Sequence, residues 1–323
     1  SAAGHNFAGT VGAGQAVRIF TGAPVPAGAD AIVIQEDTEA SGDRVVVREG
    51  APAGRYVRRA GGDFARGDVL LKTGRVLTAR DIGIAAAMNV PWLMVRRRPR
   101  VAILSTGDEV VMPGDPLGPN QIVSSNSLAL AAYVRVLGGE PVNLGIARDS
   151  EDSLRALAAG ARGADLLVTI GGASVGDHDL VRAVLEGEGM ALAFWKIAMR
   201  PGKPLMFGSL GAMRVLGLPG NPVSSLVCAH LFLKPLVEKL GGRRLTNRAH
   251  EARLGADMPE NDTRQDYVRA RMESTGGEIV ATPFDVQDSS MLRNFASADG
   301  LIVRPPHAPA AKAGEICAVL PLR

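Results

Sequence analysis

The chain has 323 residues, of which 46% are hydrophobic and 21% charged, a balance typical of a folded globular protein. A net charge of only +3 and an aromatic content of 4% argue against a nucleic-acid partner, which would call for a basic surface with stacking side chains. No apolar run approaches the roughly 20 residues of a membrane span, so we expect a cytoplasmic protein without a membrane partner.

The first 63 residues contain β-forming runs separated by turns. The runs AVRIF (16–20), AIVIQ (31–35) and RVVVRE (44–49) are rich in β-branched residues, with glycine, proline and aspartate between them. The pattern predicts three strands and a small β domain over 1–63. The following segment changes character, because ARDIGIAAAMN (79–89) predicts an alanine-rich helix. We interpret 64–98 as a helical connector that takes part in dimerisation.

Residues 99–248 alternate between strand and helix patterns. Apolar runs predict strands at 101–104, 141–146, 165–170 and 214–218. Capped, periodic segments predict helices at 124–139, 151–161, 179–189 and 219–240. Such alternation is typical of a mainly parallel sheet with helices on both faces. With short strands again over 249–323, we expect an α/β fold in which this domain is flanked by smaller β domains.

Three loops that follow predicted strands carry most of the polar chemistry. They are STGDE (105–109), GGASVGDHD (171–179) and LPGNPVSS (218–225). In an open α/β sheet, ligands bind at the carboxyl ends of the strands, so we expect these loops to meet there. Glycines let the backbone approach a phosphate, and paired aspartates suit a hydrated Mg²⁺. A plain surface loop is the alternative for each one taken alone.

Two further features could join this edge of the sheet. Asp149 follows a predicted strand, where it could either add a carboxylate or simply cap the next helix. The segment FWKIAMRPGKPLMFG (194–208) brings together Lys196, Arg200 and Lys203, which suit a small oxyanion or a phosphate. Its apolar flanks indicate partial burial, where unpaired charge is costly. A solvated basic edge is the alternative. Cys228 lies on an apolar helix face and is expected to be inert.

Taken in order, these motifs resemble the molybdopterin molybdenumtransferase family, which includes bacterial MoeA proteins and the gephyrin E domain. The resemblance covers nearly the whole chain. Its segments are RIFTGAPVPAGADAIVIQED (18–37), RRPRVAILSTGDEV (97–110), SSNS (124–127), LGIARD (144–149), GGASVGDHD (171–179), KIAMRPGKPL (196–205), GLPGNPVSS (217–225), RQDYVRA (264–270) and QDSSML (287–292).

The resemblance implies a homodimer with a molybdopterin-binding α/β domain. It also implies an activity in molybdenum cofactor biosynthesis: adenylylated molybdopterin is hydrolysed in a reaction that depends on Mg²⁺ and molybdate, molybdenum enters the dithiolene, and AMP is released. The family's catalytic carboxylates correspond to Asp179, Asp149 and Glu109. Asp179 and Asp149 are the implied Mg²⁺ ligands.

The resemblance also implies two sets of binding residues. Those for the pterin nucleotide are Thr21 (reaching the site from the partner subunit), Ser105, Thr106, Gly107, Asp108, Gly171, Gly172, Ser174, Gly176, Asp177, Asn221 and Pro222. Those for molybdate are Arg200, Lys203, Ser224, Arg264, Ser289 and Lys196. Position 200 is arginine where many relatives have lysine. The role of His178 is left open.

Two alternatives and one departure accompany this interpretation. A nucleotide pyrophosphatase of the CinA type would use the α/β domain alone, and the RPGKP, RQDYVRA and QDSS segments argue against it. A non-catalytic pterin-binding scaffold is the second alternative. Members of the family begin with a helical segment and an NSAMDGYA-like stretch containing an important aspartate. We expect the printed chain to lack that aspartate and part of the dimer-forming domain.

Overall fold

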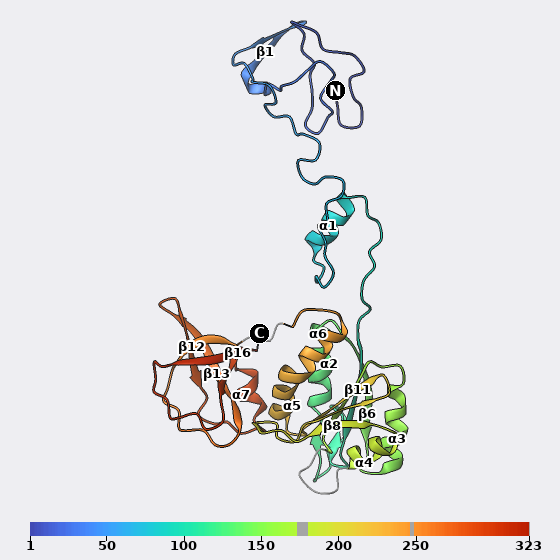
Figure 1. The fold of residues 1–323 in the computed structure, drawn as a ribbon, viewed down its shortest axis with the longest axis vertical. Coiled ribbons are helices and arrows are strands. Elements are labelled where there is room, and N and C mark those ends of the chain that lie inside the picture. The colour runs from blue at the N-terminus through green and yellow to red at the C-terminus, as the bar shows by residue number, and fades with distance from the viewer. Residues whose placement is uncertain (173–179, 246–248, 323) are drawn as a thin grey trace. The chain divides into compact units, whose positions relative to one another are not determined.

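The computed structural model describes residues 1–172, 180–245 and 249–322, and Figure 1 shows its elements. The chain divides into two compact units, Ser1–Lys72 and Thr73–Arg323. The described part contains no helix with the length and apolarity needed to cross a membrane.

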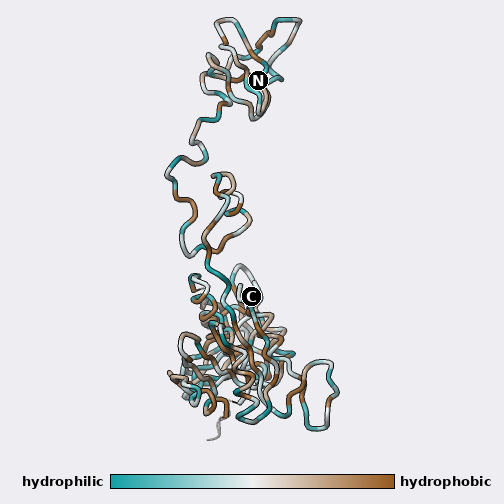
Figure 2. The backbone as a smooth tube through the Cα atoms, turned by 90° about the vertical axis from the view of Figure 1, so that its right-hand side faces the viewer, coloured by the Kyte–Doolittle hydropathy of each residue, from teal (hydrophilic) through white to brown (hydrophobic). Residues whose placement is uncertain are grey.

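The first unit is mostly irregular. Its regular elements are the 3₁₀ helix η1 (Gln35–Asp37) and the antiparallel strands β1 (Thr38–Ser41) and β2 (Arg44–Val47). The strand predicted at 44–49 is therefore confirmed, but those predicted at 16–20 and 31–35 are wrong. These segments make isolated backbone hydrogen bonds, such as Ile32 N–H to Arg55 C=O at 3.1 Å, instead of the continuous ladder that a strand requires. Short hydrophobic and hydrophilic stretches alternate along this unit (Figure 2).

The second unit begins with helix α1 (Ala79–Ala87), which confirms the helix predicted at 79–89. Its first turn is a capping box, in which the backbone N–H and the hydroxyl of Thr78 both donate to the Asp81 carboxylate at 2.8 Å. These two hydrogen bonds, with the nearby Arg75, lower the pKa of Asp81 to about 2. The helix start is thus fixed locally by sequence.

The central sheet of the second unit contains six strands in the order β6-β3-β7-β11-β10-β8. Their bounds are β3 (Arg100–Thr106), β6 (Glu140–Ala147), β7 (Leu166–Ile170), β8 (Ala191–Trp195), β10 (Met206–Leu210) and β11 (Met213–Leu218). Strands β6, β3, β7 and β11 run parallel, whereas β10 is antiparallel to both β11 and β8. The predicted mainly parallel sheet is confirmed. A short parallel pair, β4 (Val110–Val111) and β5 (Ile122–Val123), lies outside it.

Helices cover both faces of this sheet (Figure 1). They are α2 (Asn126–Val136), α3 (Glu151–Ala158), η2 (Ala159–Ala161), α4 (Leu180–Gly187), α5 (Pro222–Cys228), the π-helical turn η3 (Ala229–Leu233) and α6 (Lys234–Leu240). Alternate residues of β3 serve the two faces: Val101 and Ile103 belong to the core with α2 and α5, whereas Ala102 and Leu104 belong to the core with α3 and α4. Cys228 is fully buried, and burial raises the pKa of its thiol to about 12, consistent with an inert thiol.

The C-terminal strands form a second sheet in the order β14-β12-β16-β15-β13-β9, and a further β13–β14 pairing closes five of them into a barrel. Their bounds are β9 (Met199–Arg200), β12 (His250–Leu254), β13 (Gln265–Thr275), β14 (Glu278–Pro283), β15 (Gly300–Arg304) and β16 (Ile316–Pro321), with helix α7 (Leu292–Ala296) between β14 and β15. Strand β9 comes from the α/β segment and pairs with β13, and Leu301 and Leu320 join the α/β core. The domain boundaries at 63, 98 and 248 stay a prediction.

Candidate functional site

The carboxyl ends of β3, β7 and β11 meet at one edge of the central sheet because these strands are parallel neighbours. Backbone hydrogen bonds tie the loops that leave them to the ends of neighbouring strands. The N–H of Gly107 donates to Ala147 C=O and the N–H of Gly171 donates to Leu218 C=O, both at 3.1 Å. The described parts of the three predicted loops therefore lie together, as expected.

The glycines that begin the loop after β7 are required by close packing. Gly171 and Gly172 have φ values of +82° and +66°, in the left-handed region that favours glycine. A Cβ on Gly172 would lie 2.4 Å from Val181 Cγ2, and one on Gly171 would lie 3.1 Å from Thr106 O. This turn thus accepts only glycine without adjustment. The predicted site residues Ser174, Gly176, Asp177 and Asp179, with His178, lie outside the described residues.

Two predicted substrate-binding hydroxyls lie beneath these loops. Ser105 and Thr106 end β3 and are 3% and 5% exposed. Thr106 donates to Ile170 C=O at 3.4 Å, whereas the Ser105 hydroxyl has no hydrogen-bond partner within the described ranges. Thr106 therefore ties two strands together at the edge. Contact of either hydroxyl with a substrate stays a prediction.

Three carboxylates lie beyond β3 and β6, at the same edge. The backbone N–H of Asp149 donates to Asp108 Oδ1 at 3.3 Å. The pKa of Asp149 is raised by desolvation and then by the negative charges of Asp108 and Glu109. Ser150, not Asp149, is the N-cap of α3, and its hydroxyl accepts from Ser153 N–H. Asp149 is therefore not used as a helix cap, and its carboxyl lies in a field that favours a bound cation.

The start of α5 meets the C-terminal domain at Ser289. Asn221 Nδ2 donates to Ser289 Oγ at 2.9 Å, and Val223 N–H donates to Ser289 C=O at 3.0 Å. Asn221 is the N-cap and Pro222 the first helical residue, as the sequence predicts. Ser224 is 5% exposed in the same turn. Two residues of the predicted molybdate set, Ser224 and Ser289, are thus brought to the same helix start.

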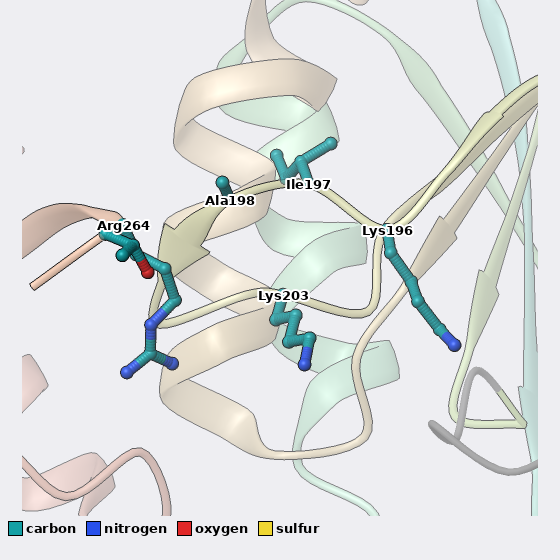
Figure 3. A pocket seen from close by; sticks show the side chains of 6 residues that line it. Lys196, Ile197, Ala198, Lys203 and Arg264 are labelled. Atoms are coloured by element: carbon teal, nitrogen blue, oxygen red, sulfur yellow. The ribbon is translucent and has the colours of Figure 1, made fainter. Parts of the chain in front are cut away.

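The cationic segment lies at this edge as well. Strand β8 runs in the same direction as β11 because both are antiparallel to β10, so Lys196 follows a carboxyl end and Lys203 precedes the start of β10. A cavity of about 410 Å³ opens here, lined by Lys196, Ile197, Ala198, Lys203, Thr263 and Arg264. Figure 3 shows the charged groups of Arg264, Lys203 and Lys196 in a row, directed to the same side. We call this cavity the cationic pocket.

The charge of Arg200 is compensated beside this pocket. Its guanidinium donates to both carboxylate oxygens of Asp266, with Nε to Oδ1 at 2.8 Å, and Nη1 reaches Asp262 Oδ2 at 3.3 Å. Arg264 Nη2 donates to the same Asp262 oxygen at 2.8 Å, and its backbone N–H donates to Asp262 Oδ1. These bonds lower the pKa of Asp262 to about 2. Arg200 does not line the cationic pocket, and its predicted contact with molybdate stays a prediction.

We expect Arg200→Lys to lower the free energy of unfolding by about 1 kcal/mol. Lysine cannot reproduce the two-pronged contact with Asp266, and the loss is moderated because the Arg200 side chain is 48% exposed and screened by solvent. Urea denaturation monitored by circular dichroism measures the change. Arg253→Lys, which removes a similar two-pronged contact with Glu278 elsewhere, is the matched control. Unchanged stability combined with lost oxyanion binding would instead make Arg200 an anion ligand.

Sequence reasoning did not identify several residues around the pocket. Thr263 lines it, Asp262 pairs with the lining Arg264, Asp266 pairs with the adjacent Arg200, and Trp195 contacts Lys196. Asp266 lies within the RQDYVRA segment that carries part of the family resemblance, so the sequence could have identified it as a candidate. Its partner could not be inferred, because the pairing of β9 with β13 joins residues 66 positions apart. Thr21 is exposed in the first unit, and its contact across a dimer stays a prediction.

Comparisons with known proteins cover the same segments. Models of the MoeA N-terminal region (domain I and II), a probable molybdopterin binding domain and the MoeA C-terminal region (domain IV) match residues 1–89, 102–239 and 251–322. A molybdopterin molybdenumtransferase from Nostoc sp. is 43% identical over 244 residues, covering 74% of this chain and 56% of the relative. One from Haemophilus influenzae is 34% identical over 331 residues, covering 99% of this chain and 82% of the relative.

Solved structures give the same result for the fold. A crystal structure of a molybdopterin biosynthesis MoeA protein from Pyrococcus horikoshii superimposes with a TM-score of 0.85 at 32% identity, covering 100% of this chain and 79% of that one. A second MoeA structure from this organism gives a TM-score of 0.79 at 24% identity, covering 99% and 78%, and supports the fold. The chain spans little more than half the length of the Nostoc relative.

Proposed function

Because this chain belongs to the molybdopterin molybdenumtransferase family, we propose that it carries the machinery that inserts molybdenum from molybdate into adenylylated molybdopterin, with release of AMP. The observation that carries the proposal is the cationic pocket next to the glycine loops at one sheet edge. A reaction between two anions needs separate binding groups for each, held close together. The sheet edge carries the cationic pocket for one anion and the glycine loops for the other.

Lys203 and Arg264 bind the molybdate dianion in this proposal. Lysine presents three donors and arginine a planar fork, and both suit oxyanion oxygens. Arg264 comes from the C-terminal domain, whereas Lys203 belongs to the α/β segment. A pyrophosphatase built on the α/β domain alone would have no use for Arg264. This arrangement therefore supports the transferase over the CinA-type alternative.

The glycine loops bind the pyrophosphate of the adenylylated substrate. Gly107, Gly171 and Gly172 have positive φ values, backbone conformations in which loop N–H groups can be presented to a phosphate, and Asn221 stands at the start of α5. Lys196 lies at the end of the cationic row, where it adds a third cation to the oxyanion site and neutralises charge that develops on the phosphoanhydride. These residues bind and orient the nucleotide.

Mg²⁺ dependence is part of the proposal, and the donor set at the edge fits the ion. The backbone N–H of Asp149 donates to the Asp108 carboxylate, and the pKa of Asp149 is raised by desolvation first and then by the negative charges of Asp108 and Glu109, which a cation would offset. No group of three His, Cys, Asp or Glu side chains with metal-binding geometry occurs in the described ranges. Mg²⁺ commonly uses one or two carboxylates and keeps waters, so this pair suffices to hold it. Bound there, Mg²⁺ would neutralise phosphate charge during hydrolysis.

A homodimer is also part of the proposal. The run 92–95 exposes apolar side chains, with Trp92 88% exposed and Met94 fully exposed. Exposed apolar runs of this kind are typical of protein–protein interfaces. Light scattering during size-exclusion chromatography should give twice the chain mass. A monomer at micromolar concentration would contradict this part.

The activity test uses the full-length protein with adenylylated molybdopterin, molybdate and Mg²⁺. We expect AMP release and molybdenum cofactor to appear in step, because hydrolysis and insertion share one site. AMP released equally well without molybdate, or from ADP-ribose, would favour the pyrophosphatase. Tight pterin binding without any turnover would favour the scaffold.

A further inference from the structure

Two cations lie against the ring of Trp195, the last residue of β8. The ammonium of Lys196 lies 3.6 Å from the ring centroid, and the guanidinium carbon of Arg182 lies 4.9 Å from it. Both distances are within the range of cation–π attraction, and indole is the strongest natural partner for a cation. Lys196 is also one end of the cationic row shown in Figure 3.

The backbone of Lys196 is arranged to make this contact. Neighbouring residues of a strand point to opposite faces, so Lys196 would ordinarily turn away from Trp195. Lys196 instead has a φ of +68°, in the left-handed region, and its N–H donates to Leu205 C=O at 2.9 Å. A lysine in this region is strained, and such strain persists only where the surrounding structure imposes it. The turn lets the side chain fold over the ring of the preceding residue.

The polar group of the indole does not explain why tryptophan stands here. Trp195 Nε1 is buried and has no hydrogen-bond partner among the residues that the structure describes. A buried unpaired donor is unfavourable, and phenylalanine would fill much of the same space without one. What tryptophan adds over phenylalanine is a larger and more electron-rich face. The face that contacts Lys196 is therefore the feature that the position uses.

We propose that Trp195 is a positioning residue of the cationic pocket: its ring holds the Lys196 ammonium in place for an incoming oxyanion. A free lysine side chain loses rotamer freedom when it binds an anion, and a lysine already held loses less. Trp195 thus raises oxyanion affinity without touching the anion. This inference rests on the proposed function of the pocket.

Binding measurements test it first. With tungstate as the probe in calorimetry, we expect Trp195→Leu to weaken binding about 3- to 10-fold and Trp195→Phe by less than about 3-fold, because the benzene ring keeps part of the attraction. Phe194→Leu is the matched control and should leave tungstate affinity unchanged. It removes the neighbouring ring of β8, whose centroid lies 5.8 Å from that of Phe207. Circular dichroism verifies that each variant is folded.

Fluorescence supplies a readout that a merely structural role would not move. Trp92 and Trp195 are the two tryptophans, so Trp92→Phe leaves Trp195 as the single emitter. We expect tungstate to change its emission when Lys196 is present, because the charge of an anion bound by the held ammonium offsets the positive field that the ammonium exerts on the ring. The change should vanish in the added variant Lys196→Met.

The outcomes separate the inference from the proposed function. The role of Trp195 would be overturned if the wild type, Trp195→Leu and Trp195→Phe bound tungstate with equal affinity while Lys203→Met bound it more weakly. The proposed function of the pocket would then still stand. Unchanged emission on tungstate binding would also overturn it. If Lys203→Met bound tungstate normally, the proposed function of the pocket would fail first.

Discussion

Lys203→Met is expected to weaken molybdate and tungstate binding about 10- to 100-fold, the effect of removing a charged hydrogen bond from an oxyanion site. Lys203 stands in the middle of the cationic row, between Arg264 and Lys196 (Figure 3). Isothermal calorimetry with tungstate gives the dissociation constants directly.

A control must separate the effect of removing any positive charge from the effect of removing the charge of Lys203. Lys312→Met removes the same charge from an exposed lysine that pairs with Asp257 at 2.8 Å, and it should bind tungstate as the wild type does. Lys203→Arg retains the charge and should bind more tightly than Lys203→Met. Equal weakening in Lys203→Met and Lys312→Met would mean that the anion responds to overall charge and not to a pocket.

Gly172→Ala is expected to have the second large effect, on both stability and nucleotide binding. An added Cβ would lie 2.4 Å from Val181 Cγ2 and would also occupy a left-handed backbone conformation. We expect the free energy of unfolding to fall by about 2 kcal/mol, because strain and overpacking add at one position. Displacement of the loop should weaken binding of adenylylated molybdopterin at least about 10-fold. Urea denaturation and a substrate titration measure the two effects.

The matched control for Gly172 is Gly211→Ala in the turn between β10 and β11. Gly211 has a similar φ of +58°, but nothing lies within 4 Å of its added Cβ. This variant should therefore lose only the backbone contribution, about 1 kcal/mol, and should bind the substrate normally. If both variants lost the same stability and bound the substrate equally well, the packing argument for the glycine loop would be wrong.

The α/β domain was predictable because its signals are local. Within the run 165–170, Leu166–Ile170 form one fully buried strand, and Asn221 with Pro222 marks the helix start where the structure has it. The general rule that ligands bind at the carboxyl ends of parallel strands then predicted that the loops lie at one edge. The alternation of Val101 and Ile103 with Ala102 and Leu104 reflects a sheet covered on both faces.

The first unit shows where local patterns mislead. AVRIF (16–20) and AIVIQ (31–35) have strand-like composition, but β propensity expresses how well a side chain fits a sheet that must exist for other reasons. Among the described residues, neither segment pairs with a neighbouring strand to form a ladder. RVVVRE (44–49) does, because β1 folds back on it through a tight turn.

The electrostatic pairing around the pocket could not be predicted from the sequence either. Arg200, Lys196 and Lys203 looked alike in sequence, as three cations within eight residues. The structure separates them: Asp266, 66 positions along the chain, pairs with Arg200, whereas Lys196 and Lys203 line the pocket together with Arg264. Such distinctions depend on the docking of the C-terminal domain through β9 and β13.

We propose that the sheet edge binds an oxyanion between the α/β segment and the C-terminal domain, in the cationic pocket. A crystal structure of the protein soaked with tungstate tests it most directly, because tungsten is located by its anomalous scattering. We expect a tungsten peak within hydrogen-bonding reach of Lys203 Nζ and the Arg264 guanidinium, and loss of that peak in Lys203→Met. Tungstate bound elsewhere, with the cationic pocket empty at saturating concentration, would contradict it.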